Sequence, residues 1–182
     1  MLSKVRHYVP LSELRSIYYA IFSSHMVYGC QIWGQENQMI NKKLDDISKL
    51  QNRALRIINF KNYQDESNPL YSSNKILKIN DFITLQNVLL VHDYLKDTLP
   101  ECFQDYFHKL DHIHPNISTK NTAKGCLFKP TFNSTNYGLK SITNHCINDW
   151  NNTAKELNKN LLETSRSQLK LIITKHLLNK YI

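Results

Sequence analysis

Several common signatures are missing from this chain of 182 residues. It contains no run of about 18 apolar residues, so no membrane-spanning helix is predicted. Its first ten residues, MLSKVRHYVP, carry cations but no apolar segment, which argues against a secretory signal peptide. We therefore expect an intracellular protein, nuclear or cytoplasmic, whose four widely spaced cysteines stay reduced.

Motifs of catalytic and phosphate-binding sites are absent as well. There is no Gly-rich phosphate loop, no G-x-S-x-G and no H-E-x-x-H. The single Asp-Asp pair, Asp45 and Asp46, is expected in mid-helix, where neighbouring side chains diverge by about 100° and pair with nearby lysines, as Asp46 could with Lys42. On these residues the chain alone is not expected to be an enzyme, and no cofactor is expected.

The sequence contains no strong metal-binding motif. It has neither a zinc knuckle nor any C-x-x-C. One looser group of candidate ligands consists of Cys102, His108, His112 and Cys126. Since its spacing is irregular, we expect surface histidines and a core Cys102 rather than a metal site.

The most clearly patterned stretch runs from residue 14 to residue 60 and predicts two amphipathic helices flanking an aromatic turn. The first helix shows the i, i+3, i+4 spacing of a buried stripe, which consists of Leu14, Ile17, Tyr18, Ile21, Phe22 and His25. In the turn, Gly29 and Gly34 are expected to permit a backbone path that a Cβ would resist. Tyr28 and Trp33 are expected to pack there, although exposed aromatic rings can also stack on bases.

The second helix, expected over about residues 39–60, separates an apolar from a basic face. Its predicted apolar stripe consists of Leu44, Ile47, Leu50, Ala54, Ile57 and Ile58. Four cations share another face, because their offsets of seven, four and three residues are near whole turns: Lys42, Lys49, Arg53 and Arg56. Such a face either is simply solvated or binds phosphates, and the charge pattern alone favours the solvated face.

The remaining sequence predicts further helices and one irregular segment. Residues 80–95 are apolar round most of a helix, which indicates a central position. A short aromatic helix is expected over residues 101–110, and further helices over residues 137–152 and 165–181. Residues 111–136 lose periodicity and predict a basic loop. The expected fold class is therefore all-α, with a helical bundle over residues 1–110, the loop as linker, and a helical C-terminal segment over residues 137–182.

The net charge of +8 is distributed unevenly along the chain. Residues 1–62 carry nine Lys and Arg against four Asp and Glu, and residues 112–182 carry ten against three. Between them, residues 63–111 carry four against eight. The two basic ends could together form a surface that binds a polyanion, or they could pack against the acidic middle within the fold. Charge alone does not decide between these two interpretations.

Three stretches, SKVRHYVP, LRSIYYAIFSSHMVYGCQIWG and ISKLQNRALRIINF, resemble the region that follows the polymerase palm in non-LTR retrotransposon reverse transcriptases of the jockey-like LINE class. The family pattern is roughly K-L-R-x-x-V-P, then I-Y-x-S-L-x-x-S-H-L-x-Y-G-x-x-x-W-G, then L-Q-x-x-A-x-R-x-I. The matching residues are Lys4, Arg6, Val9, Pro10, Tyr18, Ser24, His25, Tyr28, Gly29, Trp33, Gly34, Leu50, Gln51, Ala54, Arg56 and Ile58. Val5 and Met26 replace leucines of the pattern, and the likeness continues more weakly over most of the chain.

The resemblance implies a polymerase thumb with its C-terminal extension, as a fragment without the palm and without the family's paired aspartates. It implies that this region grips template RNA or an RNA–DNA hybrid, independently of sequence. The residues implied in phosphate contacts are Lys42, Lys49, Arg53 and Arg56, with Lys120, Lys124 and Lys129 of the loop as weaker candidates. Two alternatives stay open: a helical protein–protein interaction module, whose partner would be the polymerase palm, and a decayed transposon remnant with no activity.

Overall fold

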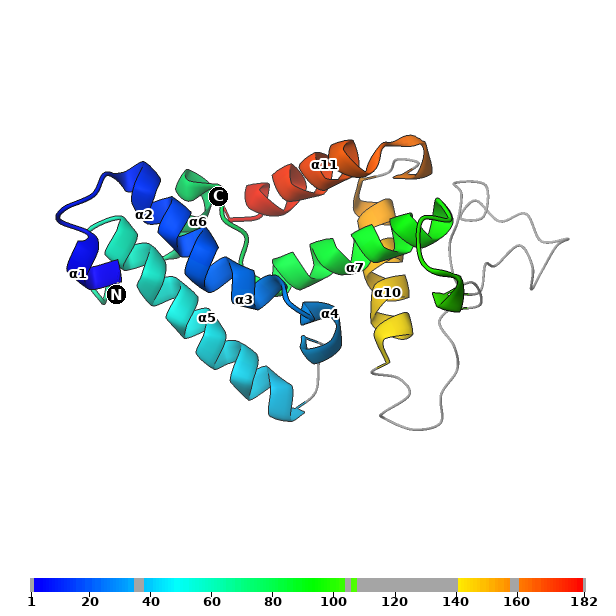
Figure 1. The fold of residues 1–182 in the computed structure, drawn as a ribbon, viewed down its shortest axis with the longest axis horizontal. Helices are drawn as coiled ribbons and strands as arrows, with labels where there is room; N and C mark the ends of the chain where they lie inside the picture. The colour runs from blue at the N-terminus through cyan, green and yellow to red at the C-terminus, as the bar shows by residue number, and fades with distance from the viewer. Residues whose placement is uncertain (1, 35–37, 104–105, 108–140, 158–160, 182) are drawn as a thin grey trace, which may run out of the picture. The chain divides into compact units, whose positions relative to one another are not determined.

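The computed structural model describes residues 2–34, 38–103, 106–107, 141–157 and 161–181 of the chain (Figure 1). Helices joined by turns make up this described part, and it contains no β-strand. The expected all-α fold class is confirmed. The predicted loop of residues 111–136, with Lys120, Lys124 and Lys129, lies outside the described residues.

The chain divides into two compact units. The first consists of Met1–Ile83 and Thr174–Ile182, and the second of Thr84–Ile173. Two helices, α7 (Ile79–Leu95) and α11 (Arg166–Asn179), begin in one unit and end in the other. This division does not follow the expected boundary at residue 110. Because α7 is apolar nearly all round, its first turn packs in the first unit and its later turns in the second.

The first unit is built from a run of short helical segments and one long helix. Its elements are α1 (Leu2–Val5), α2 (Leu11–Ile17), the π-helical segment η1 (Tyr18–Ser23), α3 (Ser24–Val27), α4 (Cys30–Trp33), α5 (Gln38–Ile58) and α6 (Asn68–Asn74). The first amphipathic helix starts at Leu11, directly after Pro10, whose backbone is extended. The predicted second helix is α5, and the polar segment that follows it leads to α6.

Two hydrophobic clusters form the core of the first unit. The larger one joins α2, η1, α5 and α6 through Leu14, Tyr18, Ala54, Leu55, Ile58, Leu70, Tyr71 and Ile76. The smaller one joins α4, α5 and the start of α7 through Cys30, Leu44, Ile79 and Ile83. Helix α5 contributes to both clusters, so the apolar face of this helix carries much of the packing of the unit.

The aromatic turn between the two helices depends on both glycines, for different reasons. Gly29 has a φ of 61°, a left-handed conformation that favours glycine. At Gly34 the constraint is space, because a Cβ would lie 2.4 Å from the carbonyl oxygen of Cys30 and 2.6 Å from Cδ1 of Ile83. Trp33 packs on the smaller cluster as expected, and its indole N–H donates to the Tyr28 carbonyl at 2.7 Å. The packing expected for the Tyr28 ring is wrong, since this residue is 86% exposed.

In the second unit, helices α7, α10 (Ile142–Leu157) and α11 are tied together by polar contacts. The Asn87 amide donates to Asp149 at 2.7 Å, which joins α7 to α10. Arg166 at the start of α11 donates to the carboxylate of Asp93 on α7 at 2.9 Å. Both ties are made from α7, whose apolar side chains are buried on several sides. The helix therefore has the central position that its sequence predicts.

Of the aromatic segment after α7, the structure describes residues 101–103 and 106–107, and these do not form the continuous helix expected over residues 101–110. The first three residues form a 3₁₀ turn, η2 (Glu101–Phe103), and Phe107 is buried with its ring against Tyr94 at 5.0 Å. Cys102 is exposed, so the expected core position is wrong: it lies in the middle of the 3₁₀ turn η2, none of whose residues is buried. Among the described cysteines, Cys30, Cys102 and Cys146 form no disulfide.

Candidate nucleic-acid interface

Helix α5 has two distinct faces, and the cations lie opposite the buried one. Its buried residues are Leu44, Gln51, Ala54, Leu55 and Ile58. At 100° per residue these positions cover an arc of about 100°, and the four predicted cations cover about 60° on the far side. The helix therefore packs along one side and presents Lys42, Lys49, Arg53 and Arg56 on the other.

The buried arc is rotated from the apolar stripe that the sequence predicts. Leu50 was expected in the core but is 57% exposed, whereas Gln51 and Leu55, which were not part of the predicted stripe, are buried. The physical reason is that Gln51 satisfies its amide inside the fold, so a polar side chain occupies the middle of the arc. Leu50 then points about 100° away from Gln51, toward the basic side.

Gln51 fixes the orientation of α5 through three hydrogen bonds. Its Nε2 donates to the Tyr18 hydroxyl at 2.9 Å and to the Leu77 carbonyl at 2.8 Å. Its Oε1 accepts from the backbone N–H of Ile79 at 3.1 Å. Burial raises the pKa of the Tyr18 hydroxyl to about 12, so this partner stays a neutral phenol at physiological pH. The network joins α5 to η1 and to the turn before α7.

Sequence reasoning did not single out Gln51 as a structural residue. The available signal was positional, because Gln51 lies seven residues after Leu44 and seven before Ile58, both within the predicted apolar stripe. A buried Asn74, whose amide donates to the Leu70 carbonyl at 2.8 Å, was missed for the same reason. In both cases the position is buried although the residue is polar, so a search for apolar periodicity does not include it.

Three of the four cations on the outer face are exposed. Lys42 and Arg53 are open to solvent. Lys49 pairs with Asp46 at 3.1 Å, and their side chains are 75% and 61% exposed. The sequence suggested a pair between Asp46 and Lys42, but Asp46 pairs with Lys49 instead. An exposed pair of this kind contributes little free energy and can open in favour of a phosphate.

Arg56, the fourth cation, is partly buried and shapes the turn that follows α5. Its Nε donates to the Asp65 carbonyl at 2.7 Å, and its guanidinium carbon lies 5.9 Å from the centre of the Tyr63 ring. These contacts hold the guanidinium in place. Arg56 therefore lies on the basic face of α5, but its side chain is held by contacts with the turn that follows the helix.

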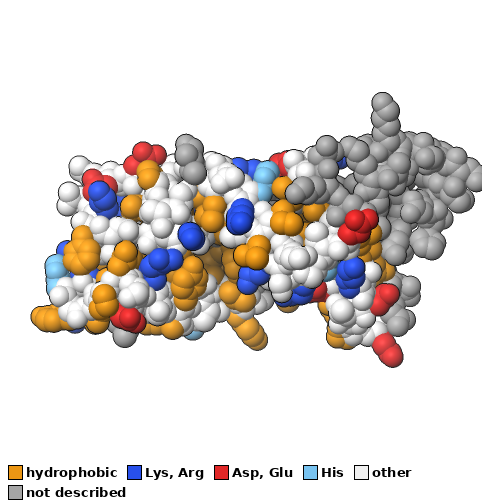
Figure 2. All heavy atoms as spheres, turned by 90° about the horizontal axis from the view of Figure 1, so that it is seen from above, with side chains coloured by type: hydrophobic (Ala, Val, Ile, Leu, Met, Phe, Trp, Pro, Cys, Tyr) orange, Lys and Arg blue, Asp and Glu red, His pale blue; other side chains and the backbone are white. Residues whose placement is uncertain are grey.

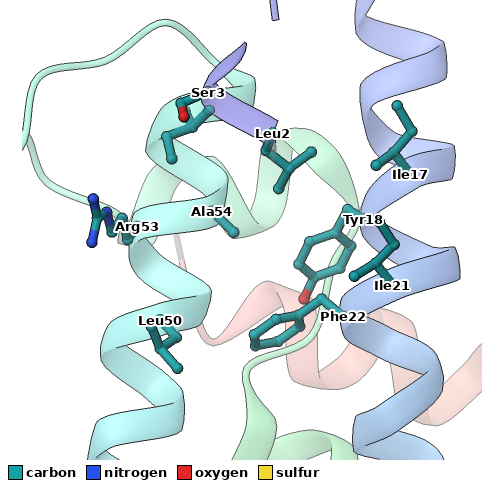
Figure 3. A pocket seen from close by; sticks show the side chains of 10 residues that line it. Leu2, Ser3, Ile17, Tyr18, Ile21, Phe22, Leu50, Arg53 and Ala54 are labelled. Carbon is teal, nitrogen blue, oxygen red and sulfur yellow. The ribbon is translucent and has the colours of Figure 1, made fainter. Parts of the chain in front are cut away.

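A groove of about 320 Å³ runs beside the basic face, between α5 and the α2–η1 stretch (Figure 3). Its lining is mostly apolar and includes Ile21, which is 44% exposed, and Leu50. The rings of Tyr18 and Phe22 stack at a centroid distance of 5.2 Å and close its inner wall. Arg53 lies at the rim, with its guanidinium pointing away from these rings (Figure 3). The outer side of α5 thus combines cations with exposed apolar side chains.

Charge is dispersed on the face that Figure 2 shows, where Lys and Arg side chains lie singly among apolar and neutral ones. By contrast, the four cations of α5 share one side of a single helix.

The described residues contain no group of three or more His, Cys, Asp or Glu placed to hold a metal ion. Of the weak candidate ligands, Cys102 is exposed, and His108, His112 and Cys126 lie outside the described part of the chain. None of the helices in the described residues has both the length and the apolar character needed to span a membrane.

Comparison of the chain with models of known protein families, with curated proteins and with solved structures found no match.

Proposed function

We propose that the outer face of α5 binds the phosphate backbone of RNA or of an RNA–DNA hybrid, without reading its sequence. The observation that carries the proposal is the placement of Lys42, Lys49 and Arg53 on the exposed side of one helix, opposite its buried arc. Cations in such a row can each neutralise a phosphate and release its counterions. The loop lysines 120, 124 and 129 remain weaker candidates for the same role.

The rigidity of the helix supports this proposal. A 21-residue helix anchored along its length by two hydrophobic clusters holds its outer cations at fixed spacings of about 1.5 Å per residue. Contacts of this kind position a nucleic acid rather than recognise its bases. The role is that of a non-catalytic thumb beside a reverse-transcriptase palm, acting in the nucleus or the cytoplasm, as the sequence resemblance implies.

The test is binding of a labelled RNA–DNA hybrid to the whole chain, measured by fluorescence anisotropy at low and moderate salt. We expect the double variant Lys49→Glu with Arg53→Glu to bind about tenfold or more weakly, because two phosphate contacts become repulsive. The matched control is Lys170→Glu with Lys175→Glu, which makes the same charge change at exposed positions of α11. Equal losses in both variants, or none in either, would remove the α5 face from the account.

A second candidate function is favoured by the groove beside α5. Leu50 and Ile21 expose apolar surface along it, which a partner helix could cover, and in the resembling family the partner would be the polymerase palm. Size-exclusion chromatography of the whole chain, with light scattering, separates the two. Self-association through this face without RNA affinity would support protein docking and count against nucleic-acid binding.

A further inference from the structure

The turn that ends α5 contains an aromatic residue in a conformation that does not suit it. Phe60 has a φ of 55°, and the N–H of Lys61 bonds to the Arg56 carbonyl at 2.9 Å, which closes the helix end. This is the left-handed position where helices usually carry glycine, and a bulky residue there is an outlier. A phenylalanine at such a position needs a reason beyond ending the helix.

Burial does not supply that reason, because Phe60 is 54% exposed. Its ring instead lies against two polar groups that flank it from the α1 side. The guanidinium carbon of Arg6 is 5.3 Å from the ring centre, and the His7 ring meets it edge-on at 5.5 Å. The Arg6 Nε–H donates to Nε2 of His7 at 3.1 Å, which orients both groups.

A second exposed ring lies three residues further along the same turn. Tyr63 is 80% exposed, and its ring is the one that faces the Arg56 guanidinium. The turn thus presents two aromatic rings, each accompanied by an arginine, directly after the helix with the basic face. All of these residues belong to the first unit.

We propose that Phe60 and Tyr63, with Arg6 and Arg56, form a stacking site for unpaired bases of single-stranded RNA or DNA. Planar rings and guanidinium groups offer π-faces to any base, and the neighbouring positive charge attracts the backbone. Duplex bases are already stacked on one another, so the site selects unpaired nucleotides. This inference rests on the proposed function, because the strand reaches the rings along the outer face of α5.

The variant that tests the site is Phe60→Gly. Glycine adopts a φ of 55° without strain, so thermal stability should stay equal or rise. Affinity for a labelled single-stranded RNA of about 12 nucleotides should fall about 5- to 150-fold, the range for losing one base-stacking ring. Affinity for polyphosphate, which has no bases, and for duplex RNA should change less than about twofold, because phosphate contacts remain.

The matched control is Tyr28→Ala, which removes a ring that is even more exposed than Phe60, at 86% against 54%, and that has no arginine beside it in the described structure. It should change single-strand affinity less than about twofold. If wild type binds RNA and polyphosphate but Phe60→Gly weakens neither, the stacking site is wrong and the phosphate face stands. Equal weakening toward RNA and polyphosphate would also refute stacking. If wild type binds neither polyanion, the proposed function and this site fail together.

Discussion

Helices α5 and α7 are both long, yet they use their surfaces in opposite ways. The buried residues of α5 fill an arc of about 100°, and those of α7 are distributed round the whole helix when plotted at 100° per residue. On α7, a polar residue such as Asn87 or His92 must find a partner inside the fold. On α5, half of the circumference is available for contacts with other molecules. The comparison separates residues that maintain the fold from those that can carry function.

The largest expected effect tests whether α5 really has two sides. Leu55→Ala should lower the free energy of unfolding by about 2–5 kcal/mol, because it empties a fully buried position. Leu50→Ala, five residues earlier, should cost less than about 1 kcal/mol, since Leu50 is 57% exposed. On α7, Leu85→Ala and Leu89→Ala should both be costly. Urea denaturation measures all four, and equal costs at residues 50 and 55 would contradict the two-faced helix.

The next effect concerns the polar centre of the buried arc of α5. Gln51→Leu should cost at least about 2 kcal/mol, because the Ile79 N–H and the Leu77 carbonyl each lose a buried partner. Gln64→Leu, in the exposed loop after α5, is the control and should stay within about 0.5 kcal/mol of wild type. The same denaturation series measures both. A harmless Gln51→Leu would show that apolar contacts alone orient α5.

Alkaline pH probes the same network through Tyr18. Its folded-state pKa of about 12 lies above the ordinary tyrosine pKa of 10.0, since burial opposes the charged phenolate. The unfolded chain therefore loses its proton first, and the stability due to this group is present below pH 10 and is lost as pH rises toward 12. The expected loss is about 2 kcal/mol, measured as the difference in urea unfolding between pH 9 and pH 12.

Tyr18→Phe supplies the comparison for that measurement. It should be less stable at neutral pH, because Gln51 loses a partner, but its stability should fall less steeply above pH 10. Burial also raises the pKa of Tyr71 and of Tyr181, so part of the alkaline loss will persist in the variant. Identical pH curves for wild type and Tyr18→Phe would contradict the assignment.

The smallest effects concern the turn that leads toward α5. Gly34→Ala should cost about 1–3 kcal/mol, because its Cβ would meet a backbone oxygen that cannot easily move. Gly29→Ala should cost about 1 kcal/mol, because its left-handed backbone strains any side chain although space is open. Thermal unfolding by circular dichroism compares the two. The reverse order would show that conformation, rather than close packing, limits this turn.

Periodicity predicted the helices well and their exact faces less well. The long apolar run gave a helix over residues 80–95, and the structure has Ile79–Leu95. For α5 the same reasoning placed Leu50 inside, because an apolar residue was favoured over a neighbouring glutamine whose partners come from η1 and the turn before α7. Those partners are distant in sequence, so a local pattern could not reveal them.

The candidate site shows the same division between local and distant information. The common face of Lys42, Lys49, Arg53 and Arg56 follows from helix geometry alone and was predictable. The hydrogen bond from Arg56 to the Asp65 carbonyl depends on the path of the following loop. The positive φ of Phe60 could not be predicted either, because a left-handed helix end is usually indicated by glycine or asparagine and not by phenylalanine.

The salt dependence of RNA binding tests the central claim most directly. For single-stranded RNA, the slope of log affinity against log salt should become shallower by about 0.7 for each phosphate contact removed. We therefore predict a smaller slope, as well as weaker binding, for Lys42→Gln, Lys49→Gln and Arg53→Gln combined. An unchanged slope in this triple variant, with wild type still bound, would show that the outer face of α5 does not touch the phosphate backbone.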